Sequence, residues 1–291
     1  MFKGYALHWR CTGMCKVVSF INMKGGVGKT TLSVNVGYTL STKFDKKVLL
    51  IDVDPQMNAT QYTLNQTQVI DIMENPKKSI YGVLVEEPKI PSIKHEPECE
   101  DSSLCEIFEI ADNFHIIPSH LNIMGLNLIE SPFMLSKFIK NNNLKEIYDV
   151  IILDSPPTIS PYTRISLLAS DAYIVPLKPD FLSLFGLPLL EGYISRLRNQ
   201  FDHDLDFVGI ILTMVAPEWR IYGSIKEKLK ENPSWNEKLF SSELKNRTSI
   251  QNALSQEYKE RNLPYIIELG DKVIESQMID VTEEFMQRLR L

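Results

Sequence analysis

Continuous apolar runs of strand length recur along this chain. The clearest are residues 17–21, 48–53, 115–117, 150–153, 173–177 and 207–214. Most of these runs do not alternate with polar residues, which is typical of strands that are covered on both faces. Helical spacing lies between several runs; after Thr30, apolar residues recur every fourth position at 32, 36 and 40. This alternation predicts an α/β fold, with helices on both faces of a mostly parallel, twisted sheet.

Two stretches fall outside the alternation. Residues 1–15 precede the first run and show no periodicity, so we expect a disordered tail or an extension from an alternative start. Between about residue 65 and residue 112 the chain is polar and irregular, most clearly in "KIPSIKHEPECEDSS" (89–103), and we expect a loop-rich insertion there. Residues 16–291 would then form one domain.

Composition and charge narrow the class of protein. The chain is 44% hydrophobic and 23% charged, and its net charge of −6 would give no general attraction to nucleic acid, so DNA binding would need a local basic patch. No segment is apolar for long enough to cross a bilayer or to act as a signal peptide, so we expect a cytoplasmic protein. The cysteines lack the C-x-x-C spacing of zinc sites, and we expect free thiols at Cys11, Cys15, Cys99 and Cys105.

A glycine-rich loop follows the first apolar run. The segment "NMKGGVGKTT" (22–31) joins a predicted strand to a predicted helix, which is the context that a phosphate-binding loop requires. Its glycines would let backbone N–H groups approach phosphate oxygens at a helix N-terminus. Lys29 would reach the β- and γ-phosphates, and the Thr30 hydroxyl would suit Mg²⁺. The expected nucleotide-binding loop thus comprises Gly25, Gly26, Val27, Gly28, Lys29, Thr30 and Thr31, whereas Lys24 lies five residues before Lys29, where most such loops have an ordinary residue.

Acidic residues follow two of the other predicted strands. Asp52 and Asp54 end the run at 48–53, and Asp154 ends the run at 150–153. Ligands of open α/β sheets bind at this carboxyl edge, and an Asp at such a position commonly assists Mg²⁺ in P-loop NTPases. Because side chains alternate along a strand, we expect only one of Asp52 and Asp54 to face the phosphates.

Three segments together resemble the ParA/MinD family of deviant P-loop ATPases. They are "KGGVGKTT" (24–31), "VLLIDVDPQMNAT" (48–60) and "YDVIILDSPP" (148–157), with weaker matches in "SIYGVL" (79–84), "IIPSHLNI" (116–123) and "PLKPDFLSLFGL" (176–187). The stretch "DPQMNAT" is more similar to the ParA (Soj-like) branch than to MinD. The resemblance implies a single-domain P-loop NTPase that hydrolyses ATP to ADP with Mg²⁺.

The resemblance also implies roles for individual residues. Lys24 would be the signature lysine, which reaches the nucleotide of the partner subunit in an ATP-bound homodimer. Asp54 would position the attacking water, and Asp154 would lie beside Mg²⁺. The positions implied to surround the base are Pro179, Asp180, Thr213 and Met214.

Further implications concern partners. The resemblance implies an ATP-state homodimer that binds double-stranded DNA without sequence specificity. With a ParB-like adaptor, this dimer would partition plasmid or chromosomal DNA, or another cargo, at the nucleoid of a bacterium or archaeon. Residues 217–262 hold nine Lys or Arg and seven Asp or Glu, a net charge of +2. Within them we expect Arg220, Lys245 and Arg247 to be the DNA contacts. Ser249 stands where the family carries a DNA-contacting arginine.

Two alternatives have weaker support. A MinD-like membrane ATPase would need a basic amphipathic C-terminal helix. The last residues, 280–291, do place Val281, Phe285 and Leu289 four apart, but the opposite face carries three acids, so we expect a packed terminal helix and no membrane binding. An iron–sulfur relative would need cysteines on the core segments after the strands, and the cysteines of this chain lie elsewhere.

Overall fold

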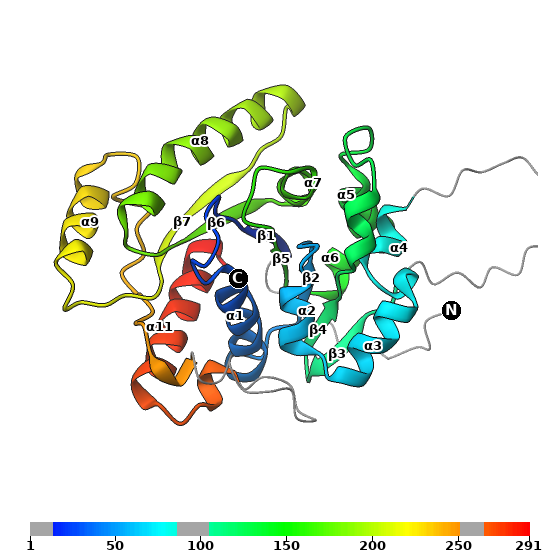
Figure 1. Ribbon diagram of the computed structural model, residues 1–291, viewed down its shortest axis with the longest axis horizontal. Coiled ribbons are helices and arrows are strands. Elements are labelled where there is room, and N and C mark those ends of the chain that lie inside the picture. The colour runs from blue at the N-terminus through cyan, green and yellow to red at the C-terminus, as the bar shows by residue number, and fades with distance from the viewer. Residues whose placement is uncertain (1–13, 86–104, 251–264) are drawn as a thin grey trace, which may run out of the picture.

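A single sheet forms the centre of the protein. The computed structural model describes residues 14–85, 105–250 and 265–291, and in it seven strands follow the order β3-β4-β2-β5-β1-β6-β7 (Figure 1). The strands are β1 Lys16–Phe20, β2 Val48–Asp52, β3 Phe108–Ala111, β4 Phe114–Ile117, β5 Val150–Asp154, β6 Ala172–Leu177 and β7 Asp206–Leu212. Every neighbouring pair is parallel except β3 and β4. The predicted α/β class is confirmed.

Helices cover both faces of the sheet. They are α1 Lys29–Phe44, α2 Asn58–Thr63, α3 Gln66–Glu74, α4 Ile80–Leu84, α5 Met134–Asn141, α6 Leu144–Ile147, α7 Pro161–Ala169, α8 Phe181–Phe201, α9 Arg220–Glu231 and α11 Lys272–Leu289. Short 3₁₀ turns add η1 Pro76–Lys78, η2 Leu121–Gly125 and η3 Ile266–Glu268. In β5, Val150 and Ile152 pack into the apolar cluster that includes α1 and α11, whereas Ile151 and Leu153 pack toward α5 and α7. Burial of both faces explains why this run does not alternate.

The predicted strands agree with the structure to within a few residues at each end. The helix expected after Thr30 is α1. The run at 207–214 ends as a strand at Leu212, and Met214 takes a left-handed conformation (φ 52°) that turns the chain. Of the expected tail, only residues 14 and 15 are described, and Cys15 is buried. The loop at 89–103 lies outside the described residues.

The expectation of an irregular stretch between about residues 65 and 112 was wrong for its described parts. It contains α3, η1, α4 and β3. A capping box starts α3: the Asn65 side chain accepts from the Gln68 backbone N–H, and the Gln68 side chain accepts from the Asn65 N–H. The edge strand β3 is short and only partly buried, so it leaves no continuous apolar run.

The C-terminal helix α11 packs against the core, beside α1 (Figure 1). Val281, Phe285 and Leu289 are buried, and the Phe285 ring stacks on Phe20 of β1 with centroids 6.0 Å apart. The apolar face of this helix is therefore used inside the protein, as expected for a packed terminal helix. Among the described residues, no helix combines the length and apolar character needed to cross a bilayer.

Candidate active site

The glycine-rich loop joins β1 to α1 at the carboxyl edge of the sheet. Gly26 (φ 69°) and Gly28 (φ 78°) take left-handed conformations, and Gly28 precedes α1 without any side-chain cap. The first backbone N–H groups of α1 therefore have no side-chain acceptor at this end, which suits an anion. The Lys29 ammonium is buried and donates to the Lys24 carbonyl oxygen over 3.3 Å. Burial lowers the pKa of Lys29, while the charges of Asp154 and Asp54 oppose that shift.

Asp154 lies at the end of β5, fully buried, and receives two hydroxyl groups from α1. Thr30 Oγ1 donates to one carboxylate oxygen over 2.7 Å, and Ser33 Oγ donates to the other over 3.0 Å. Burial raises the pKa of Asp154 to about 6, against the lowering effects of the Thr30 hydrogen bond and the Lys29 charge. Ser33 was not foreseen, although it lies one turn after Thr30 and therefore on the same side of α1.

Asp52 and Asp54 have different surroundings. Asp52 turns toward α2, where its carboxylate accepts from the Thr60 N–H (2.8 Å) and hydroxyl (2.7 Å). Its other oxygen accepts from the Asp54 N–H over 3.1 Å. Burial, and next the charge of Asp154, raise the pKa of Asp52 well above its ordinary range. Asp54 accepts from the Gln56 N–H over 2.9 Å, and its charge acts on Lys29. The charges of Asp54 and Asp154 thus act on the loop lysine, whereas the Asp52 carboxylate is occupied by the Thr60 and Asp54 donors.

Lys24 is held by α8. Its ammonium lies 2.6 Å from the carboxylate of Asp180, which also caps α8 by accepting from the Ser183 N–H over 2.8 Å. Burial tends to raise the pKa of Asp180, but the hydrogen bonds from Lys24 and Ser183 outweigh it and hold that pKa below the ordinary value. Both side chains are partly exposed. Lys24 therefore points to the N-terminal end of α8 and not toward the phosphate-binding loop of its own subunit.

The residues expected around the base lie on two sides of the loop. Thr213 donates its hydroxyl to the Val27 carbonyl oxygen over 2.7 Å, which fixes the end of β7 against the loop. A small cavity of about 60 Å³ adjoins this contact, lined by Gly28, Thr31, Leu32, Thr213, Met214, Leu244, Lys245, Asn246, Arg247, Ile250 and Ile266. A larger cavity of about 270 Å³ is lined by Lys178, Pro179, Asp180, Met214, Ala216, Trp219, Ile221 and Tyr222. Met214 contributes to both.

The three residues expected to contact DNA are not in one patch. Arg220 is exposed at the start of α9, whereas Lys245 and Arg247 line the small cavity beside the phosphate loop. The Arg247 guanidinium also lies 4.0 Å from Asp271, and Ser249 donates to that same carboxylate over 3.4 Å. The last part of the stretch 217–262, from residue 251 on, lies outside the described residues.

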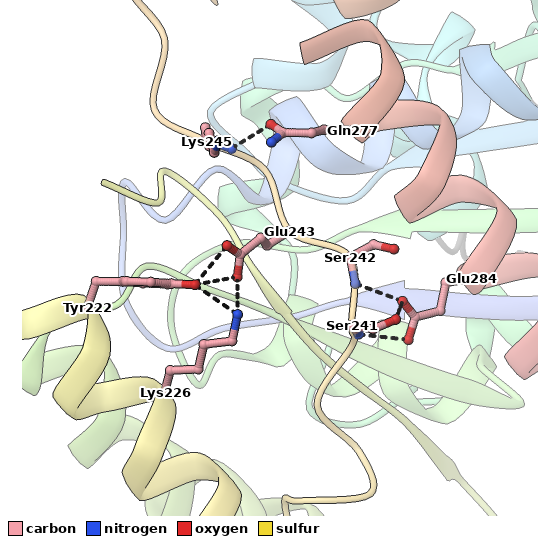
Figure 2. A network of polar contacts seen from close by, with 8 residues as sticks. All are labelled: Tyr222, Lys226, Ser241, Ser242, Glu243, Lys245, Gln277 and Glu284. Carbon is pink, nitrogen blue, oxygen red and sulfur yellow. Dashed lines mark hydrogen bonds and ion pairs between the residues drawn. The ribbon is translucent and has the colours of Figure 1, made fainter. Parts of the chain in front are cut away.

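A polar network fixes the segment that carries Lys245. Figure 2 shows Glu243 accepting from Tyr222 (2.8 Å) and Lys226 (2.9 Å) of α9. Ser241 and Ser242 of the same segment donate hydrogen bonds to the Glu284 carboxylate of α11 (Figure 2). The Lys245 backbone N–H donates to the Gln277 side chain over 3.2 Å. The segment is thus tied to both α9 and α11 before it reaches the cavity at Arg247.

Comparison with known proteins identifies the family. The model of the AAA domain family matches residues 15–207. A virulence plasmid ParA family protein from Chlamydia psittaci is 32% identical over 201 residues, which cover 68% of this chain and 69% of the relative. This chain belongs to the ParA/MinD family of P-loop ATPases.

Other ParA-type proteins are similar over most of their length. The sporulation initiation inhibitor protein Soj of Bacillus subtilis is 28% identical over 224 residues, covering 75% of this chain and 80% of Soj. Among solved structures, a putative plasmid partition protein from Borrelia burgdorferi bound to AMPPNP superposes with a TM-score of 0.67. That likeness covers 95% of this chain and 100% of the other at 24% identity, so it supports the ParA fold.

Proposed function

We propose that this ParA/MinD-family protein is a ParA-type partition ATPase. In this proposal it binds ATP and Mg²⁺, forms an ATP-sandwich homodimer and binds duplex DNA without sequence specificity. It would hydrolyse ATP to position plasmid or chromosomal DNA, or another cargo, with a ParB-like adaptor. The observation that carries the proposal is the pair of lysines in one loop: Lys29 is buried beside Asp54 and Asp154, whereas Lys24 points out to the head of α8.

The residues around Asp154 fit a magnesium ion. The Asp154 carboxylate is buried with two hydroxyl donors, and among the described residues no cationic side chain is hydrogen-bonded to it. Its raised pKa expresses the cost of that buried charge. Hydroxyl and carboxylate oxygens are the ligands that Mg²⁺ prefers. Thr30 and Asp154 would hold the ion on one side of the phosphates. When bound, Mg²⁺ neutralises charge on the β- and γ-phosphate oxygens.

The remaining residues would orient the reaction. The loop N–H groups and Lys29 would bind the phosphates, and Asp54 would hold the attacking water in line with the γ-phosphate. Lys24 would add its charge to the nucleotide of the partner subunit, much as an arginine finger does. Hydrolysis would then depend on the dimer, because neither subunit supplies both lysines to its own nucleotide.

The basic residues expected to contact DNA differ in how exposed they are. Lys245 and Arg247 line the cavity next to Gly28, so contact with bound nucleotide is the nearer role for them. Arg220 is exposed on α9 and is the better DNA candidate. In a dimer each such contact would occur twice, and phosphate contacts add through release of counterions. The MinD-like alternative is disfavoured because α11 buries its apolar face.

A gel shift on a duplex of arbitrary sequence tests the proposal. We expect binding with ATP, weak or no binding with ADP or without nucleotide, and a steep loss of affinity with added salt. Binding that ignores the nucleotide, or no binding in any state, would contradict the partition function. The Lys29→Ala variant, which should lose the phosphates, is the control for nucleotide dependence.

A further inference from the structure

The first half of α8 carries large apolar side chains on its outward face. We call Phe181, Leu182, Phe185 and Leu189 the α8 patch. Their exposed fractions lie between 47% and 73%. Residues 181–190 include no charged residue, and the hydroxyl of Ser183, the polar side chain among them, is turned inward and buried. A helix that is apolar on all sides is normally enclosed by other protein, so the patch indicates a surface that becomes covered.

The second half of the same helix is an ordinary surface helix. Charged residues begin at Glu191, and Arg196, Asn199 and Gln200 lie on the side of the helix that continues the patch. A Cβ added at Gly186 or Gly192 would meet no atom within 4 Å, so another chain could approach the backbone of α8 closely. The apolar outward face is therefore confined to the end of α8 that lies nearest the phosphate loop.

The patch is continuous with the mouth of the active site. It starts one residue after Asp180, the ion-pair partner of Lys24. Phe181 also meets α9, with the Lys228 ammonium 5.2 Å from the ring centroid, and Figure 1 shows α8 along the edge of the molecule next to α9. Trp219, which is 54% exposed, lines the cavity shared by Pro179 and Asp180. Apolar surface thus extends from the Lys24–Asp180 pair onto the outside of α8.

We propose that a second copy of this chain covers the α8 patch in the ATP-bound dimer. The inference rests on the proposed dimer and adds the apolar contact that would hold its subunits together. A dimer that brings Lys24 to the partner's nucleotide also brings the head of α8 to the partner, because Lys24 and α8 meet through Asp180. An apolar patch is self-complementary, as a two-fold interface requires. Its aromatic and leucine side chains supply the buried anchors that stabilise such interfaces.

The charges around the patch favour this occupant over others. No carboxylate lies within the patch, and the charges that border it are mixed in sign: Asp180, paired with Lys24, precedes it, Lys228 lies over Phe181, and Glu191 follows it. A basic segment of an adaptor and an anionic lipid surface would therefore each meet like as well as opposite charges around the patch. The α8 patch of a second copy is itself uncharged, so it can pack against this patch without pairing or opposing any charge.

The first test is a charge substitution with a matched control. The double variant Leu182→Glu with Phe185→Glu should fold and bind nucleotide as before, because these side chains point outward. Its ATP-dependent dimer should weaken by roughly tenfold or more, since unpaired charges would be buried at the interface. The control, Asn199→Glu with Gln200→Glu, adds the same charge to the same side of the helix farther on and should dimerise normally. Light scattering against protein concentration, with a non-hydrolysable ATP analogue, measures both.

A cross-linking experiment identifies the occupant directly. A photo-reactive amino acid replaces Leu182 in the full-length chain, and the protein is mixed with ¹⁵N-labelled wild type before irradiation. We expect cross-links between labelled and unlabelled copies with ATP and not with ADP.

The other outcomes distinguish this inference from the proposed function. If wild type dimerises with ATP, the patch variant dimerises equally well and no cross-link forms between copies, the inference is wrong and the proposed function stands. If wild type remains a monomer with ATP, the dimer in the proposed function is wrong, and the inference that rests on it is wrong as well. Loss of sedimentation with phosphatidylglycerol vesicles as the only defect would assign the patch to lipid and overturn the inference.

Discussion

The ammonium of Lys24 lies 2.6 Å from the carboxylate of Asp180, across 156 positions of sequence. The same carboxylate caps α8 through the Ser183 N–H. In the proposed mechanism Lys24 must reach a neighbouring subunit. The ion pair that Lys24 forms with Asp180 of its own subunit must therefore break first. In that mechanism the ion pair would oppose dimerisation until nucleotide and partner are both present.

Removing the charge of Asp180 should make the dimer form more readily. Asn is as good a helix cap as Asp, so Asp180→Asn removes the ion pair and keeps the cap. For a partly exposed pair we expect dimerisation to strengthen by about 2- to 5-fold. Sedimentation or light scattering at increasing ATP measures the shift. Asp180→Ala, which also loses the cap, is the control for damage to α8. Weaker dimerisation of Asp180→Asn would mean that the pair assists the interface instead of restraining Lys24.

Asp52 is expected to act on hydrolysis indirectly, through its contacts with Asp54 and Thr60. Thr60→Val removes one hydroxyl that donates to Asp52 and accepts from the Ser119 N–H over 2.8 Å. We expect the free energy of unfolding to fall by about 1–3 kcal/mol, because buried polar groups lose a partner. The turnover number should fall while ATP affinity changes little, since only the placement of Asp54 is disturbed.

Thr63→Val is the matched control for that prediction. Thr63 is also a buried residue of α2, but its hydroxyl donates over 2.8 Å to the Ala59 carbonyl oxygen within the same helix. Denaturant unfolding and steady-state ATPase assays compare the two variants. Equal turnover in both would show that the Asp52–Thr60 contact supports only the fold.

Arg247 and Arg220 should separate nucleotide binding from DNA binding. Arg247 lines the cavity beside Gly28, so Arg247→Ala should weaken binding of a fluorescent ATP analogue by about tenfold, the loss of one charged hydrogen bond. Arg220→Ala should leave nucleotide affinity unchanged and lower DNA affinity and its salt dependence. If Arg247→Ala binds nucleotide normally and loses only DNA, the sequence-based assignment of Arg247 to DNA is the better one.

Glu284 should stabilise the fold only where it is ionised. Burial tends to raise its pKa, but hydrogen bonds from Ser242 and Ser241 (Figure 2), together with one from Arg288, outweigh burial and hold the pKa below the ordinary value of 4.5. A depressed pKa in the folded state adds stability above the unfolded pKa, and this stability is lost as pH falls through the folded value. Glu284→Gln should therefore cost about 1–2 kcal/mol at pH 7. In urea unfolding the difference should shrink below pH 4.5, and a difference independent of pH would refute the charge-based account.

The sequence was most informative where local chemistry and local structure coincide. The glycine loop, the continuous strands and the acids at strand ends each depend on neighbouring residues, and the structure has the strands and α1 where the pattern predicted them. The edge strand β3 was missed because an exposed edge needs no continuous apolar run. The start of α3 could have been predicted from a capping-box pattern, Asn65 followed three residues later by Gln68, although the surrounding stretch is polar and lacks a clear periodicity.

Long-range contacts could not be read from the chain. Nothing local to Lys24 or Asp180 indicates that they meet, and the placement of Arg247 beside Gly28 depends on how the segment after β7 returns over the loop. Strand position alone did not separate Asp52 from Asp54; the family resemblance assigned the water-positioning role to Asp54, and the coordinates add the Thr60 contacts that occupy Asp52. Ser33 could have been found by asking which hydroxyl lies one turn after Thr30.

The central claim is that Lys24 serves the nucleotide of the other subunit, and a mixing experiment tests it most directly. Lys24→Ala should bind ATP yet hydrolyse poorly, and Asp54→Ala should bind ATP and dimerise yet hydrolyse poorly. In a mixed dimer, one site has its own Asp54 and receives Lys24 from the partner, so that site should be active. We predict that mixing the two inactive variants restores ATPase activity. Activity that stays at the sum of the separate variants, while mixed dimers are shown to form, would contradict a role for Lys24 across the interface.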